Sequence, residues 1–143
     1  MTPSSTAVLW PGFALAGLTF LVMAEMYRRR FTQMRRERIT PGAVATSAQS
    51  ARLLTDSAAA DNFRNLLELP LLFYVALLLA YVTGQDQAAI LVLAWLFVGL
   101  RAAHSAIHCI GNRVVPRFIA FICSALVLLL LWARLAHGVF THV

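Results

Sequence analysis

Four long apolar stretches, separated by short polar segments, make up most of the hydrophobic and polar pattern of the chain. They lie at residues 7–27, 66–82, 88–110 and 114–133. Each is close to the roughly 20 residues that a helix needs to cross about 30 Å of hydrocarbon. The pattern predicts an all-α integral membrane protein, a bundle of four transmembrane helices, formed by residues 1–143 as a single domain.

The composition agrees with a location in a membrane. Apolar residues make up 60% of the chain and charged residues 13%, and the mean hydropathy is +0.74, whereas soluble domains carry roughly 25% charge. The first stretch has no basic residue before it and no small-residue cleavage site after it, unlike a signal peptide. We therefore expect it to stay on the mature chain as a span.

The arginines predict how the chain is oriented. Seven of the twelve Lys and Arg residues lie between residues 28 and 61, and Arg113 and Arg117 flank the connection between the third and fourth stretches. By the positive-inside rule both connections face the cytoplasm, which places both termini on the opposite side. The alanine- and arginine-rich composition, without an organelle signal, favours the inner membrane of a bacterium.

Residues 28–61 are predicted to form a basic cytoplasmic loop that starts with RRRFTQMRRER. Such a run can bind anionic lipid head groups or nucleic acid, but anchoring at the membrane surface explains it without a partner. We therefore expect contact with membrane lipid and no nucleic-acid ligand. Beyond Pro41 and Gly42, a turn signal, residues 43–60 are rich in helix formers and favour an extension of the second helix into the cytoplasm.

Two polar stripes interrupt the apolar pattern. On a helix each residue turns the side-chain direction by about 100°, so polar residues at the end of the third stretch share one face. These residues are Arg101, His104, Ser105, His108 and Asn112. A second polar stripe, equally wide, lies at the start of the second predicted helix. It consists of Asp61, Arg64, Asn65 and Glu68.

The predicted topology places both stripes in the cytoplasmic half of the membrane, near Arg113 and Arg117. Ionisable groups at the centre of a span cost at least about 2.5–3.5 kcal/mol each and normally face one another or a wet cavity. We expect a buried pocket in which Glu68 pairs with Arg64 or Arg101. Such pairs could simply hold helices together at roughly 0.6 kcal/mol per contact. However, the cations outnumber the acids, which favours an anionic ligand.

These stripes resemble a known family. DNFRNLLELPLLFY at residues 61–74 and RAAHSAIHCIGNRVVPRF at residues 101–118 resemble the MAPEG family, the membrane-associated proteins of eicosanoid and glutathione metabolism. The resemblance implies a homotrimer of four-helix bundles. It also implies glutathione bound between neighbouring subunits on the cytoplasmic side, and a lipophilic second substrate that enters from the bilayer.

The resemblance also implies roles for single residues. Those that would hold glutathione are Arg64, Asn65, Glu68, Arg101 and His104. Arg117 would stabilise the glutathione thiolate, with Arg113 as the alternative. Further possible pocket contacts are Asp61, His108 and Asn112. His108 departs from the family pattern, because several eicosanoid enzymes have a tyrosine there, and it is more typical of bacterial members.

The function that this resemblance implies is that of a microsomal-type glutathione S-transferase or peroxidase. A thiol of pKa about 8.5 is mostly protonated at neutral pH, whereas its thiolate is the nucleophile. A guanidinium that lowers this pKa by about two units contributes roughly 2.7 kcal/mol. An alternative is a non-catalytic member that binds and presents lipid. A further alternative makes His104 and His108 metal or haem ligands, but the sequence lacks a third ligand in register, so we expect no metal.

Overall fold

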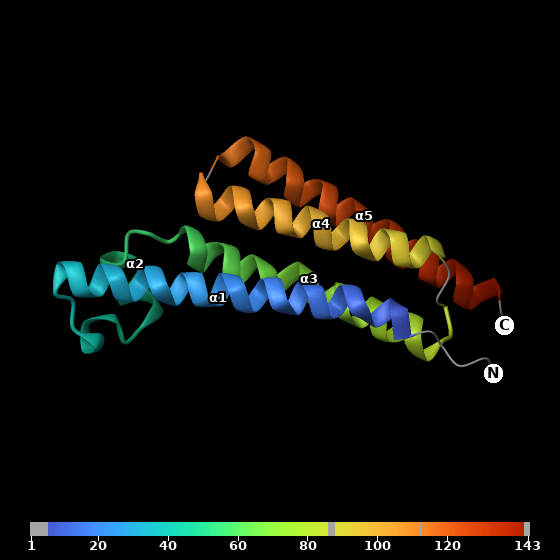
Figure 1. The fold of residues 1–143 in the computed structure, drawn as a ribbon, viewed down its shortest axis with the longest axis horizontal. Coiled ribbons are helices and arrows are strands. Elements are labelled where there is room, and N and C mark those ends of the chain that lie inside the picture. Colours follow the sequence, from blue (N-terminus) through green and yellow to red (C-terminus); the bar gives the residue numbers. More distant parts are fainter. Residues whose placement is uncertain (1–5, 86–87, 112, 142–143) are drawn as a thin grey trace.

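The computed structural model describes residues 6–85, 88–111 and 113–141, and within them four long helices dominate (Figure 1). They are α1 (Trp10–Glu37), α3 (Ala58–Val82), α4 (Ala88–Ile110) and α5 (Val114–Thr141). A short 3-10 turn, η1 (Thr6–Leu9), precedes α1. Each of the four helices is long and apolar enough to cross a membrane. The predicted all-α bundle of four spans is therefore confirmed.

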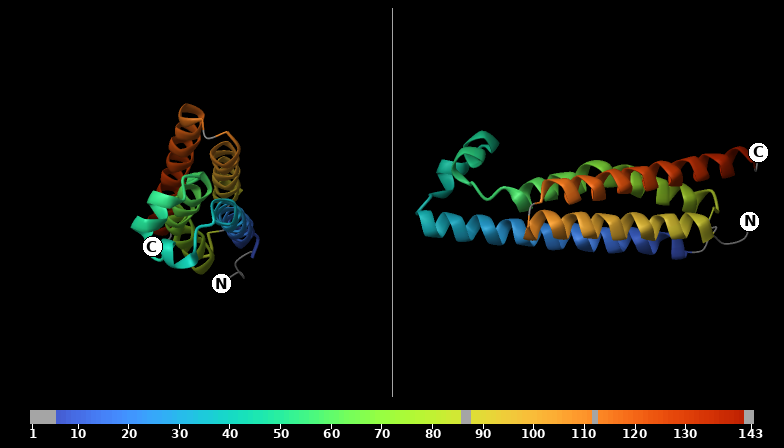
Figure 2. Two further views of the ribbon diagram at one scale, coloured as in Figure 1. Left: turned by 90° about the vertical axis from the view of Figure 1, so that its left-hand side faces the viewer. Right: turned by 90° about the horizontal axis from the view of Figure 1, so that it is seen from above.

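The axes of the four helices are roughly aligned, and each helix runs in the opposite direction to the one before it in the chain, as Figures 1 and 2 show. α1 packs on α3, α4 packs on α5, and the two pairs are joined through contacts of α4 with α3 and α1. One end of the bundle combines the end of α1, the start of α3, the end of α4 and the start of α5. We call this the arginine-rich end. The start of α1 and the end of α5 lie at the opposite end.

Apolar side chains at helical spacing form the core between the helices. Phe73 of α3 and Phe97 of α4 are both 0% exposed, and their rings stack with centroids 4.5 Å apart. The outer faces of the same helices are apolar too, for example at Leu71, Leu78 and Leu129. A helix that is apolar all round suits a bilayer, because lipid replaces water as its solvent.

The segment predicted as a basic loop begins as helix. α1 has 28 residues and so spans about 42 Å at 1.5 Å per residue, which carries it past the expected end of the first span at residue 27. It ends where Arg38 adopts a left-handed conformation, with φ of 54°.

The expected extension of the second helix through residues 43–60 is interrupted. This segment holds a 3-10 turn, η2 (Pro41–Val44), and a short helix, α2 (Ser47–Leu53), whose N-terminus is capped reciprocally by Thr46 and Gln49. Leu54 is extended, so α3 begins separately at Ala58. Helix-forming residues alone could not reveal this break.

At the end of the bundle opposite the arginine-rich end, Gly138 leaves room for the buried side-chain amide of Gln85. Gln85, which follows α3, is buried, and its side chain lies directly against Gly138 of α5. A Cβ atom on residue 138 would overlap the end of the Gln85 side chain, which would then have to turn away. Gly138 therefore leaves room for the Gln85 side chain against the end of α5.

Arg29 ties three segments together at the arginine-rich end. Its Nε donates to Glu25 at 2.7 Å, its Nη1 lies 3.3 Å from an Asp56 oxygen, and its Nη2 donates to the carbonyl of Cys109 at 2.7 Å. This carbonyl belongs to the last turn of α4, where backbone acceptors lack helical partners and a positive charge is favoured. One guanidinium thus joins α1, the segment just before α3 and the end of α4.

We predict that Arg29→Ala lowers the free energy of unfolding by about 1.5–3 kcal/mol, the usual value of hydrogen bonds to charged groups. The matched control is Arg28→Ala, because Arg28 also pairs with Glu25 but its side chain is 67% exposed, and exposed pairs contribute about 0–1 kcal/mol. Thermal denaturation of both variants in the same detergent measures the difference. Equal thermal midpoints for the two variants would show that the contacts of Arg29 stabilise the fold no more than the exposed pair of Arg28 does.

Candidate functional site

The polar stripe of α4 faces into the bundle. Arg101 is 0% exposed, and His104, Ser105 and His108 are buried with it. Asn112, the last residue of the predicted stripe, lies outside the described residues. The inner surface of the arginine-rich end is therefore polar, although the span that carries it is otherwise apolar.

Arg101 connects α4 to α3 and α5. Its Nη2 donates to the backbone carbonyl of Asn65 at 2.7 Å, and its Cζ lies 5.7 Å from the centre of the Phe121 ring, within cation–π range. Its Nε and Nη1 are buried and find no hydrogen-bond partner among the described residues. A buried guanidinium with two donors to spare is costly unless a further acceptor meets it.

The two histidines of the stripe present further unpaired nitrogens. His104 Nδ1 lies 3.0 Å from the carbonyl oxygen of Arg117. A carbonyl can only accept, so Nδ1 carries the proton of this bond. The rings of His104 and His108 meet edge to face, with centroids 5.6 Å apart. Within the described part of the chain, His104 Nε2 and His108 Nδ1 have no partner.

Asn62 is a site residue that sequence reasoning missed. It is fully buried between α3 and α4, where its Oδ1 accepts from Ser105 Oγ at 3.3 Å and its Nδ2 donates to Cys109 Sγ at 3.4 Å. The signal that could have found it is the spacing of Asn62 with Leu66 and Phe73, which places all three on one helix face. Asn62 thus belongs to the inner face of α3.

The predicted stripe of α3 points largely outward. The side chains of Arg64 and Asp61 are 72% and 46% exposed, Glu68 is exposed and Asn65 is half-buried. Arg64 approaches Asp61 at 3.7 Å, whereas Glu68 makes no ion pair with a described residue. The expected buried pairing of Glu68 with Arg64 or Arg101 is therefore wrong for the single chain.

The reason lies in the rotation of α3 about its axis. The spacing of residues along a helix fixes which side chains share a face, but it does not determine which face meets the neighbouring helix. Leu66 and Pro70 take the inner face together with Asn62. Asp61, Arg64 and Glu68 are consequently turned toward the outside of the bundle.

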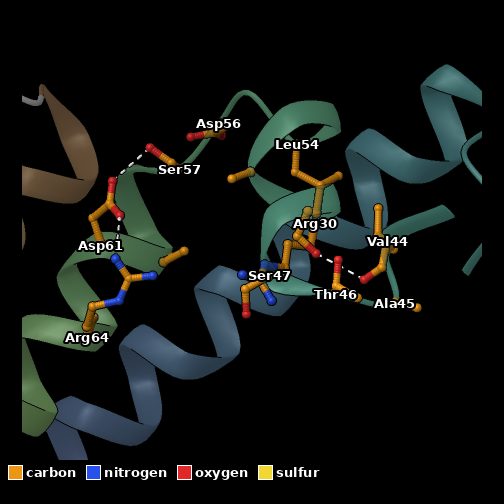
Figure 3. Close-up of a pocket in the computed structure, with 13 residues that line it drawn as sticks. Arg30, Val44, Ala45, Thr46, Ser47, Leu54, Asp56, Ser57, Asp61 and Arg64 are labelled. Atoms are coloured by element: carbon orange, nitrogen blue, oxygen red, sulfur yellow. Dashed lines mark hydrogen bonds and ion pairs between the residues drawn. The ribbon is translucent and has the colours of Figure 1, made fainter.

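Arg64 and Asp61 line a pocket of about 320 Å³ at the arginine-rich end (Figure 3). Arg30 of α1 closes one side, and hydroxyl-bearing residues of the α2 region, among them Thr46, form another. Asp61 accepts a hydrogen bond from Ser57 at 2.8 Å. The outward stripe therefore borders a polar cavity with both positive and negative groups.

The remaining predicted residues lie at the start of α5. Arg117 is half-buried and Arg113 is exposed. The carbonyl of Arg117 joins the inner polar cluster through His104, so α5 brings its first turn next to the stripe of α4. Within residues 6–85, 88–111 and 113–141, three His, Cys, Asp or Glu side chains nowhere gather in a way that could hold a metal ion.

Comparison with known proteins identifies the family. A family model described as the MAPEG family matches residues 8–137. The chain belongs to the MAPEG family. Membership confirms the resemblance drawn from the two stripes, and it makes this MAPEG protein a membrane protein of glutathione or eicosanoid metabolism. Neither a curated protein nor a solved structure matches the chain.

We predict that Arg101 contributes little to the stability of the empty protein. Replacing a buried charge by an apolar side chain of similar volume is often neutral or stabilising, so Arg101→Met should leave the thermal midpoint in detergent unchanged or raise it. Asn62→Ala is the comparison, because it leaves a buried hydroxyl without its acceptor and should cost about 1–3 kcal/mol. If Arg101→Met destabilises the protein as strongly as Asn62→Ala, the role of Arg101 is structural.

Proposed function

We propose that this MAPEG protein is a glutathione-dependent membrane enzyme that conjugates glutathione to lipophilic electrophiles or reduces lipid hydroperoxides. The observation that carries the proposal is the buried Arg101 guanidinium, whose Nε and Nη1 have no acceptor among the described residues. Guanidinium groups bind carboxylates through paired, charge-assisted hydrogen bonds. Glutathione offers two carboxylates, one ammonium group and one thiol.

The charges at the arginine-rich end complement such a ligand. Arg64 and Arg101 supply cations for the carboxylates, while Glu68 supplies an anion for the ammonium group. Asn65 and His104 add polar groups to the same set. The outward direction of Arg64 and Glu68 supports a site completed by a neighbouring copy, consistent with the homotrimer that the family resemblance implies. Asp61, His108 and Asn112 are the further contacts that we assign to this pocket.

Arg117 takes the role of thiolate stabiliser, with Arg113 as the alternative. The thiol proton passes to solvent, and the thiolate then attacks. With a chloronitrobenzene a carbon–sulfur bond forms and chloride leaves. With a lipid hydroperoxide two glutathione molecules are oxidised to the disulfide, while the peroxide is reduced to an alcohol and water. The arginine-rich end would face the cytoplasm, where glutathione is made, and the second substrate would come from the bilayer.

The test separates binding from turnover. Glu68→Ala should raise the dissociation constant for glutathione about 10- to 100-fold, because a charged hydrogen bond is lost. Arg117→Ala should lower turnover of a chloronitrobenzene about 100-fold at saturating glutathione, as expected for a thiol pKa about two units higher. For purified protein in detergent, a titration with glutathione followed by thiolate absorbance measures binding, and the rate of chloronitrobenzene conjugation at saturating glutathione measures turnover.

The control is Arg52→Ala, which removes an exposed arginine of α2 and should behave like the parent. If Glu68→Ala and Arg117→Ala both conjugate at the parent rate, the assignment of the site is wrong. If the parent protein binds a lipid yet shows neither thiolate absorbance nor glutathione-dependent turnover, the protein is instead a non-catalytic, lipid-presenting member of the family.

A further inference from the structure

We propose that His104 is a positioning residue for Arg117, and that its two ring nitrogens have separate tasks. Nδ1 fixes the first turn of α5, from which Arg117 extends, while Nε2 is left to meet the ligand. This inference rests on the proposed function, because Arg117 stabilises the thiolate there. It adds a residue that acts on the reaction through the backbone of another residue.

The hydrogen-bonding geometry defines the state of the ring. His104 is buried, and its Nδ1 lies 3.0 Å from the Arg117 carbonyl oxygen. Because the oxygen is an acceptor, the proton sits on Nδ1, and in the neutral ring Nε2 then carries a lone pair. That nitrogen is buried without a hydrogen-bond partner in the described chain. One ring thus holds the backbone with one nitrogen and keeps the other for a further contact.

The hydrogen bond from His104 fixes a part of α5, its first turn, that has few hydrogen bonds of its own. The connection between α4 and α5 is short, and the first backbone amides of a helix have no helical partner. Pro116 has no amide hydrogen, so the first intrahelical bond of this turn runs from Arg117 N to the Arg113 carbonyl, at 3.2 Å. Few bonds within the helix thus hold its first turn. The bond from His104 ties this turn to the inner face of α4.

Phe121 reinforces the same tie one turn later. Its ring lies 5.9 Å from the His104 ring and 5.7 Å from the Arg101 guanidinium carbon, measured from ring centre. Two side chains of α4 therefore contact α5 at successive turns of one face. Together these contacts set the rotation of α5 about its axis, and with it the direction in which the Arg117 side chain leaves the helix.

A small error in this rotation matters because the guanidinium sits at the end of a long side chain. A displacement of about 1 Å at a reacting group can cost about 100-fold in rate. A change at His104 Nδ1 can therefore affect turnover without removing any group that contacts glutathione. Loss of Nε2 should affect binding instead.

Two substitutions test the roles of His104 Nδ1 and Nε2 separately. In His104→Asn the side-chain amide nitrogen takes the place of Nδ1 and can still donate to the Arg117 carbonyl, but nothing remains at the position of Nε2. In His104→Gln the amide reaches the position of Nε2, and the donor at Nδ1 is lost. Each variant is the control of the other, since both replace the ring by a neutral amide.

For His104→Asn we expect turnover at saturating glutathione and thiolate absorbance within about threefold of the parent, with a dissociation constant for glutathione raised about tenfold. For His104→Gln we expect turnover and thiolate absorbance lowered about 10- to 100-fold, with the dissociation constant nearly unchanged. Retained turnover in His104→Gln would overturn the proposal, as would an equal loss of turnover in both variants.

Amide hydrogen exchange of residues 113–121 in detergent distinguishes this proposal from the proposed function. His104→Gln should exchange faster than the parent there, and His104→Asn should not. If the parent lacks glutathione turnover while this difference in exchange persists, the positioning role stands and the proposed function fails. If the parent turns over but both variants exchange and react like it, the positioning role fails alone.

Discussion

Burying the Arg101 guanidinium inside a membrane-spanning bundle carries a large desolvation cost, because the residue is 0% exposed and no carboxylate of the described residues lies within ion-pair distance of it. The protein meets part of this cost with the Asn65 carbonyl and the face of Phe121. These two contacts come from different helices, so the charge draws α3 and α5 to the same level of α4. The polar contacts of the arginine-rich end are therefore arranged around this guanidinium, although its removal is not expected to destabilise the empty protein.

The burial of Arg101 also affects how α3 presents its side chains. Once Arg101 binds the backbone of α3, the side chain of Asn65 remains half-buried and available, while Asn62 links to Ser105 and Cys109. Because the inner face of α3 is occupied in this way, its charged residues are turned outward. A ligand that meets both Arg101 and Arg64 must therefore bridge the interior and the outer face of the bundle, a geometry that suits a site shared between subunits.

Hydrophobic periodicity predicted the fold well, because the length of an apolar stretch reports directly on the thickness of the bilayer. It also predicted that Arg101, His104 and His108 share one face. It could not place the Asp61, Arg64 and Glu68 stripe, since the spacing of residues along a helix does not determine which face meets the neighbouring helices. It also missed Phe121, whose contact with Arg101 arises from the packing of two helices and leaves no trace in either helix alone.

The contact of Gln85 with Gly138 makes the two ends of the bundle differ in the kind of contact that holds them. That contact depends on shape, which dissolved ions do not alter, whereas the contacts of Arg29 with Glu25 and Asp56 are electrostatic and weaken as ionic strength rises. Raised salt should therefore weaken the contact of Arg29 with Asp56 and leave the contact of Gln85 with Gly138 unchanged. The two ends of the bundle are therefore held by contacts of different kinds, and those of Arg29 at the arginine-rich end are the ones that respond to ionic strength.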